Sequence, residues 1–378
     1  MDKRLLRRFY RRFFRKNSAT ILVVLGVILL LGKLTSCAPN HNTSNTTSAS
    51  PSTTTVKPVE DSDFEVHFID VGQGDSTLIK CDNHYMLIDA GENDKGDVVV
   101  NYLKSQNVTK LDYLIGTHPD SDHIGGLDTV INNIKCDNIL LSGKISQTKT
   151  FKDVLTAIEN TNNTYSVPNV GDTFNLGSAK ISIIGPVKEY EDNNNNSIVV
   201  IVEYSGKKIA FMGDAEKESE SDILQNGIDV DVDVIKIGHH GSRSSSTREF
   251  LSAASPKYAI ISCGMDNSYG HPHREALTIL REMKVKLYRT DVQGTVIMYI
   301  KNDNISFNVS TCTNYKDGDG VEAVLYTGSY VLNTNSKKFH YPTCEHANNI
   351  SENNKEISVQ DRNTLIENGY SPCGYCKP

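Results

Sequence analysis

The chain has 378 residues, of which 38% are apolar, so its length allows one large globular domain with accessories or two to three domains. Residues 1–16 contain eight Lys and Arg against Asp2 alone, a net charge of +7, so the overall charge of −7 leaves −14 on the rest of the chain. An acidic body argues against tight non-specific binding of nucleic acid, because such binding depends on basic side chains that release counterions.

The N-terminal region, residues 1–37, is a basic flank followed by an apolar run. Residues 19–32 carry no charge, and Thr20 is their only polar side chain before Lys33 interrupts the run. This length is typical of a signal-peptide core, and an extension to Ser36 is just long enough to cross a membrane. Because the basic flank comes first, we expect the N-terminus in the cytoplasm and the remainder of the chain outside.

The segment Leu34-Thr35-Ser36-Cys37 resembles a bacterial lipobox, in which Cys37 would be acylated. An uncleaved signal anchor and a lipoprotein signal both stay open, and both predict a membrane-tethered protein. Residues 38–62 are nearly all Ser, Thr, Asn and Pro. Such a composition cannot bury enough apolar surface to become ordered, so these residues are predicted to form a flexible spacer.

Several strands are predicted before the first long helix. The predicted strands are residues 65–70, 77–80, 85–91 and 111–115, and the predicted helix is residues 97–106. Strands that come first do not fit the alternating pattern of a doubly wound sheet. No helix follows Gly72 and Gly74, so these glycines are not expected to form a dinucleotide-binding loop.

Four candidate metal ligands lie directly after the last of these strands: His118, Asp120, Asp122 and His123. Mixed nitrogen and oxygen donors suit Zn²⁺, Mn²⁺ or Fe better than Ca²⁺ or Mg²⁺. A polar loop that caps the next helix is the plainer alternative. The apolar strand before the loop and the glycine pair after it favour a metal site.

Later strand ends carry similar side chains. Asp214 follows a predicted strand at residues 208–212 and is either a ligand or the N-cap of a helix at residues 215–224. His239 and His240 follow a strand at residues 233–238. One of this pair is a predicted ligand and the other a substrate contact or a support for a ligand, and the sequence leaves the assignment open.

Two further residues are candidates for contacting an anionic substrate. Arg243 lies in a Ser-rich segment that suits an anionic oxygen or is a plain polar turn. His271 follows a strand at residues 257–263 and is a candidate phosphate contact or general acid.

These segments resemble the metallo-β-lactamase superfamily, and most closely the hydrolase domains of the ComEC/Rec2 family of DNA-uptake proteins. The resemblance rests on residues 66–76, 87–91, 117–123, 211–214, 237–242 and 269–272. It implies an α/β (α+β) domain with an αββα sandwich over residues 63–305.

The resemblance also implies a mechanism. Asp214 would bridge two divalent ions, Zn²⁺ or Mn²⁺, that share an activated hydroxide, while Asp122 orients this nucleophile and Arg243 and His271 stabilise developing charge. Typical members have His where this chain has Asp120, which makes that subsite harder and argues against β-lactam hydrolysis. No His lies near residues 193–197, where some relatives supply one, so one ion is expected to be loosely held.

The C-terminal region, residues 323–378, is predicted to be a separate module that begins with two short strands within residues 324–333. Its candidate zinc ligands are His340, Cys344, Cys373 and Cys376, and a structural zinc would stabilise so small a core. The alternatives are a Cys373–Cys376 or Cys344–Cys373 disulfide, or His346 in place of His340. The pattern resembles the small metal-binding domain of the Ada DNA-repair protein.

The sequence therefore predicts a membrane-tethered, extracytoplasmic, metal-dependent hydrolase of the bacterial cell surface. Its substrate is predicted to be a phosphodiester, and the resemblance implies DNA. One alternative is a cell-wall phosphoesterase acting on a phosphorylcholine-type group. Another is a non-catalytic binding protein in which the metals are only structural. Oligomeric state is not predicted.

Overall fold

The computed structural model describes residues 64–323, 329–360, 362–376 and 378. The predicted membrane segment and spacer, residues 1–62, lie outside the described residues. Within the described part of the chain, no helix combines the length and the apolar character needed to span a membrane.

The first sheet has eight strands in the order β15-β14-β1-β2-β3-β4-β5-β6. These strands are β1 (Phe64–Phe68), β2 (Thr77–Cys81), β3 (His84–Ile88), β4 (Lys110–Gly116), β5 (Lys135–Leu141), β6 (Tyr165–Ser166), β14 (Val296–Lys301) and β15 (Asn304–Phe307). The sheet is antiparallel from β15 to β3 and parallel from β3 to β6.

The second sheet has seven strands in the order β13-β12-β11-β10-β9-β8-β7. These strands are β7 (Thr173–Leu176), β8 (Ala179–Gly185), β9 (Val199–Tyr204), β10 (Lys207–Phe211), β11 (Val234–Lys236), β12 (Tyr258–Ile261) and β13 (Lys286–Arg289). Strands β10 to β13 run parallel, so the residues that follow β10, β11 and β12 emerge at the same edge.

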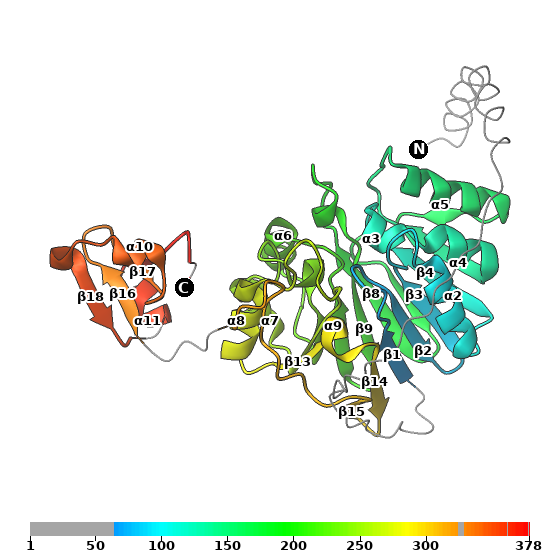
Figure 1. Ribbon diagram of the computed structural model, residues 1–378. Helices are drawn as coiled ribbons and strands as arrows, with labels where there is room; N and C mark the ends of the chain where they lie inside the picture. The colour runs from blue at the N-terminus through cyan, green and yellow to red at the C-terminus, as the bar shows by residue number, and fades with distance from the viewer. Residues whose placement is uncertain (1–63, 324–328, 361, 377) are drawn as a thin grey trace, which may run out of the picture. The chain divides into compact units, whose positions relative to one another are not determined.

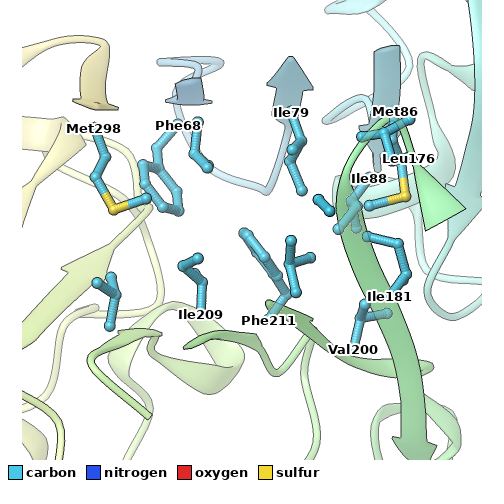
Figure 2. Close-up of a cluster of buried hydrophobic side chains, with 14 of the residues drawn as sticks. Phe68, Ile79, Met86, Ile88, Leu176, Ile181, Val200, Ile209, Phe211 and Met298 are labelled. Carbon is cyan, nitrogen blue, oxygen red and sulfur yellow. The ribbon is translucent and has the colours of Figure 1, made fainter. Parts of the chain in front are cut away.

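The two sheets face each other across one apolar core (Figure 2). In β1, Phe64, Val66 and Phe68 point into this core because alternate residues of a strand share a face. The ring of Phe68 lies 6.2 Å from that of Phe211 on the opposite sheet. Burial of such side chains is the main source of folding free energy for the sandwich.

Helices cover the outer face of each sheet (Figure 1). The first sheet is covered by α2 (Gly96–Ser105), α3 (Ser121–Ile124), α4 (Leu127–Asn133) and α5 (Lys149–Asn160). The second is covered by α6 (Lys217–Gln225), α7 (Arg248–Ala254) and α8 (Arg274–Glu282), and α9 (Thr290–Gln293) follows β13. This helix–sheet–sheet–helix order confirms the predicted αββα sandwich.

The C-terminal module has its own four-stranded sheet in the order β18-β16-β17-β19. Its elements are β16 (Tyr330–Asn333), β17 (Lys338–His340), α10 (Glu345–Asn348), β18 (Lys355–Ser358), α11 (Arg362–Glu367) and β19 (Ser371–Pro372). Of the two strands predicted within residues 324–333, one is present as β16, and residues 324–328 lie outside the described residues. The core consists of two small apolar clusters.

Candidate metal centre

The predicted ligands follow the ends of neighbouring strands. The loop after β4 carries residues 118–123, Asp214 follows β10, and the pair at 239 and 240 follows β11 in a 3₁₀ turn, Gly238–Gly241. Since β10 and β11 are parallel, their carboxyl ends meet at one edge of the second sheet. The side chains of both sheets converge at this edge.

A close backbone approach fixes the loop that carries these ligands. The amide of Asp75 donates to the carbonyl of Asp122 at 3.0 Å. A Cβ on Gly74 would lie 2.3 Å from that same carbonyl oxygen, and Gly74 has a φ of +120°. Only glycine fits this position, which explains the glycine-rich segment before Asp75.

One group of donors is formed by His123, His240, Asp122 and Asp214. The Nε2 atoms of His123 and His240 lie 3.3 Å apart. His123 Nε2 is 3.0 Å from Asp214 Oδ1, and His240 Nε2 is 3.1 Å from Asp122 Oδ2.

The other ring nitrogen of each histidine is already engaged. His123 Nδ1 donates to Asp89 Oδ2 at 2.8 Å, and His240 Nδ1 donates to the carbonyl of Ser262 at 3.0 Å. Each Nε2 therefore faces the other and the surrounding carboxylates, so a positive charge must lie among them. The set fits a divalent cation with nitrogen and oxygen ligands.

A second group is formed by His118, Asp120 and Asp214. His118 Nε2 lies 3.6 Å from Asp120 Oδ2 and 3.8 Å from Asp214 Oδ2. This nitrogen is buried and has no hydrogen-bond partner among the described residues, which fits a metal ligand. Ser197 contacts the opposite nitrogen, Nδ1, at 3.3 Å, in the region where no histidine is present to complete the set.

Asp214 lies between the two groups. Its Oδ1 faces His123, while its Oδ2 lies 3.6 Å from His240 Nε2 and 3.8 Å from His118 Nε2. Asp214 does not cap α6, because this helix begins at Lys217 and its N-cap is Glu216. Asp120 occupies the N-cap position of α3, but its side chain makes no capping hydrogen bond. Neither Asp120 nor Asp214 therefore caps a helix with its side chain, in contrast to the alternative considered from the sequence.

The electrostatics of the site favour positive charge. Burial lowers the pKa of His123, but Asp214 and Asp89 outweigh burial and raise that pKa well above its usual value. Burial likewise opposes ionised His240, yet Asp214 and Asp75 raise its pKa to about 10. Asp214 is buried, and burial alone would raise the pKa of its carboxyl group. The neighbouring histidines, His123 foremost, outweigh burial and hold this pKa well below its usual value. The same carboxylates would stabilise bound metal ions.

Asp75 and Lys236 support the site, and neither is among the candidate site residues that the sequence pattern predicts. Asp75 Oδ1 lies 3.2 Å from His240 Nδ1, and Asp75 Oδ2 lies 2.8 Å from Lys236 Nζ. A ligand atom of Asp75 lies within 4.8 Å of those of His123, Asp214 and His240. Asp75 Oδ1 is buried without a hydrogen-bond partner among the described residues and lies beside the nitrogen of His240 that points away from the other ligands, a position that suits orienting His240 or binding a metal ion. The sequence feature that could have indicated this pair is Lys236, a charged residue in the otherwise apolar strand β11.

Asp89 supports the other histidine. It accepts hydrogen bonds from the amide and the hydroxyl of Thr117 at 2.8 and 2.7 Å, besides that from His123. Asp89 is itself in the left-handed region, with a φ of 59°. The segment 87–91 was noted as a motif, but its role as a support for His123 was not predicted.

The two adjacent histidines have different environments. Both have left-handed backbones, with φ of 47° for His239 and 52° for His240, and their ring planes lie at 73° to each other. His240 is buried in the first donor group. His239 lies at the more open side, with Nε2 3.7 Å from Asp214 Oδ2 and Nδ1 3.0 Å from Glu216 Oε1.

His271 lies beside this pair, and Arg243 does not lie among the buried donors. The ring of His271 is 5.4 Å from that of His239 and 5.9 Å from that of His240. Burial, then His240 and His239, lower the pKa of His271 to about 3, which favours its neutral form, and its roles as a phosphate contact or a general acid stay predictions. The side chain of Arg243 is mostly exposed, 3.7 Å from Glu275.

The C-terminal module contains a second, separate donor set. One ligand atom each from His340, Cys344, Cys373 and Cys376 lies within 4.8 Å of the others. The three cysteines are free thiols, and Cys344 Sγ lies 3.6 Å from His340 Nδ1. His346 instead stacks on Tyr375, with ring centroids 4.5 Å apart. One histidine and three thiolates are a suitable ligand set for structural zinc.

Comparison with known proteins identifies the family. Residues 69–265 match the metallo-beta-lactamase superfamily. The chain is 31% identical to ComE operon protein 3 of Bacillus subtilis, over 67% of this chain and 35% of that protein. It is 29% identical to competence protein ComA of Neisseria gonorrhoeae (63% and 32%) and 27% identical to recombination protein 2 of Haemophilus influenzae (64% and 29%). It thus spans about a third of the length of these relatives. The chain belongs to the metallo-β-lactamase superfamily and is homologous to the ComEC/Rec2 proteins, as its motifs predicted.

Proposed function

We propose that the hydrolase domain is a metal-dependent phosphodiesterase. The observation that carries this proposal is the carboxylate of Asp214, buried between two groups of imidazole and carboxylate donors. A carboxylate in this position suits a pair of divalent ions. When bound, two such ions lower the pKa of a water molecule and neutralise charge on the transferring group.

The donor set favours a phosphodiester over a β-lactam. Asp120 supplies an oxygen ligand where typical members have a histidine, and Asn193 holds that carboxylate in place by a hydrogen bond of 2.6 Å. Oxygen ligands suit harder ions, so Mn²⁺ competes with Zn²⁺ at this position. A diester carries a negative charge in both the ground state and the transition state, and hard cations neutralise it well.

The remaining residues would bind and orient the substrate. His239 lies on the open side of Asp214, and Glu216 fixes its ring by accepting a hydrogen bond from Nδ1. The buried Nδ1 of His271 has no partner among the described residues, so it is available to a phosphate oxygen or to a water molecule. The resemblance to DNA-uptake proteins makes DNA the proposed substrate.

The test is metal content measured together with diesterase activity. Purified protein loaded with Mn²⁺ or Zn²⁺ should hydrolyse bis-p-nitrophenyl phosphate. Asp214→Ala should lose at least one bound ion and about a hundredfold or more in kcat/KM. Asp153→Ala, which removes a surface carboxylate paired with Lys149, is the matched control and should match the wild type. A metal-loaded wild type that leaves diesters and DNA intact would contradict the proposal.

Two further proposals concern the ends of the chain. Residues 1–37 would tether the protein to the membrane, with the hydrolase outside the cell. This predicts that deletion of these residues moves the protein from the membrane fraction to the soluble fraction. The C-terminal donor set would hold one zinc ion, in a structural module or an adaptor that contacts DNA or the cell wall.

A further inference from the structure

We propose that Tyr269 is a stacking platform for an unpaired nucleobase next to the scissile phosphate. The inference rests on the proposed phosphodiesterase and specifies its substrate as single-stranded nucleic acid. Tyr269 lies in the loop between β12 and α8, two residues before His271. It is 59% exposed, which is unusual for an aromatic side chain beside a buried centre.

The ring of Tyr269 is held against the centre. It stacks on His271 with a centroid distance of 5.6 Å and an interplanar angle of 18°. His271 in turn packs edge-on against His239, whose Nε2 is 3.7 Å from Asp214. The rings of His271 and His239 therefore separate Tyr269 from the carboxylate of Asp214. A base is separated from its own phosphate by a single sugar, so a nucleotide can reach both positions.

The loop is rigid enough to present the ring. Asn267 Oδ1 accepts from the amides of Tyr269 and His271, and Asn267 Nδ2 donates to the carbonyls of Gly264 and His271. The amide of Gly318 also donates to the carbonyl of Gly270 at 3.2 Å. A fixed aromatic side chain binds a base at low conformational cost.

The surroundings favour a base over a quaternary ammonium group. Recognition of a choline-type cation uses a cage of several aromatic rings. In the described part of the chain, His271 is the only aromatic or imidazole ring that packs against Tyr269. Charged groups of both signs flank this loop, because a Cβ on Gly270 would lie 3.4 Å from the Asp319 carboxylate while the Arg243 guanidinium lies 3.7 Å from Glu275, so the preference for a base rests on the aromatic contacts.

Stacking also resolves a difficulty raised by the net charge. The chain beyond residue 16 carries −14, so counterion release contributes little to binding of nucleic acid. Base stacking on an aromatic side chain depends weakly on such charge, and it is effective for unpaired bases of any sequence. It would supply affinity that the acidic surface does not.

The experiment compares two chromogenic diesters, thymidine 5′-(p-nitrophenyl phosphate) and methyl p-nitrophenyl phosphate. Tyr269→Ala should lower kcat/KM for the thymidine diester about 5- to 100-fold, mainly through KM, and change the methyl diester less than about twofold. Tyr269→Phe should keep wild-type values. Tyr165→Ala, an exposed tyrosine on β6, is the matched control. Binding of metal-loaded protein to oligothymidylate should weaken by the same factor in Tyr269→Ala, while binding to an abasic oligonucleotide should not.

Several outcomes would overturn the stacking proposal. An equal loss on both diesters would mean that Tyr269 only positions His271. Unchanged kinetics and unchanged oligonucleotide binding would exclude a base contact. A selective loss on p-nitrophenyl phosphorylcholine would assign the platform to a choline-type group. If the wild type cleaves no diester, the proposed function fails, and the binding comparison still decides whether Tyr269 contacts a base.

Discussion

The buried pair of Lys236 and Asp75 allows a sharp test of how the metal centre is built. Lys236 is 2% exposed, and its Nζ lies 2.8 Å from Asp75 Oδ2 and donates to the carbonyl of Ile237 at 2.9 Å. Burial opposes an ionised Asp75, but Lys236 and then His240 lower its pKa to about 2. Asp75 therefore stays ionised, because the positive charges of Lys236 and His240 offset the cost of burying its carboxylate.

Lys236→Met should remove this compensation and leave a buried carboxylate without its cation. Loss of one partner of a buried ion pair costs about 3–5 kcal/mol. That is a large part of the roughly 5–15 kcal/mol that stabilises a typical domain. The chain has no Trp, so urea unfolding of metal-free protein should be followed by circular dichroism. A loss below about 1 kcal/mol would refute the argument.

A double variant separates stability from metal binding. Asp75→Leu with Lys236→Met removes both charges and keeps similar volumes, so most of the lost stability should return. His240 then keeps its hydrogen bond to Ser262 but loses its carboxylate partner. We expect about 10–100-fold weaker binding of one of the two ions, measured by calorimetric titration. Wild-type affinity in the double variant would show that Asp75 does not orient His240.

Three further predictions test other parts of the chain. Burial raises the pKa of Glu220 to about 7, so its folded form retains the proton more tightly than the unfolded chain, and stability is lost as pH rises through about 4 to 7. Between pH 5 and pH 8, the free energy of unfolding of the metal-free wild type should fall by about 2–3 kcal/mol more than that of Glu220→Gln, as measured by urea unfolding. Parallel pH profiles of the two proteins would contradict this prediction. In Gly318→Ala the new Cβ would lie 2.3 Å from the carbonyl carbon of Gly270, in the loop that carries His271. We therefore expect the free energy of unfolding to fall by about 1–3 kcal/mol and kcat to decrease. Gly143→Ala, whose Cβ would make only a 3.4 Å side-chain contact, is the control and should not change either quantity. Cys373→Ser should lose one zinc equivalent by elemental analysis and keep the hydrolase ions, and His346→Ala should lose none.

The sequence predicted the ligands that lie close together along the chain. Residues 118–123 bring four donors into one loop, and the apolar strand before them fixes where that loop emerges. Asp214 was recognisable for the same reason, at the end of β10. The sandwich itself was implied by the resemblance of these motifs to the metallo-β-lactamase superfamily, whereas the order of strands and helices excluded only a doubly wound sheet. These features depend on local pattern, which a single sequence records well.

The supporting residues could not be predicted, because their partners are distant in sequence. Asp89 and His123 are 34 positions apart, and Asp75 and Lys236 come from different sheets. The choice between the adjacent histidines was open for another reason. Alternation along a strand assigns faces only while the strand continues, and β11 ends at Lys236. The next residues adopt left-handed conformations that no strand pattern describes.

The charge of the centre links metal loading to substrate binding. The ligands and their supports include five carboxylates and one buried lysine: Asp75, Asp89, Asp120, Asp122, Asp214 and Lys236. Two divalent cations bring this set to neutrality when the histidines are uncharged. Without cations, the raised pKa values of His123 and His240 keep both rings protonated at neutral pH, so the set carries a net charge of −2 and repels an anionic diester. For the proposed phosphodiesterase we therefore expect the ions to favour substrate binding as well as hydrolysis, so the metal-free protein should bind oligothymidylate more weakly than the metal-loaded protein.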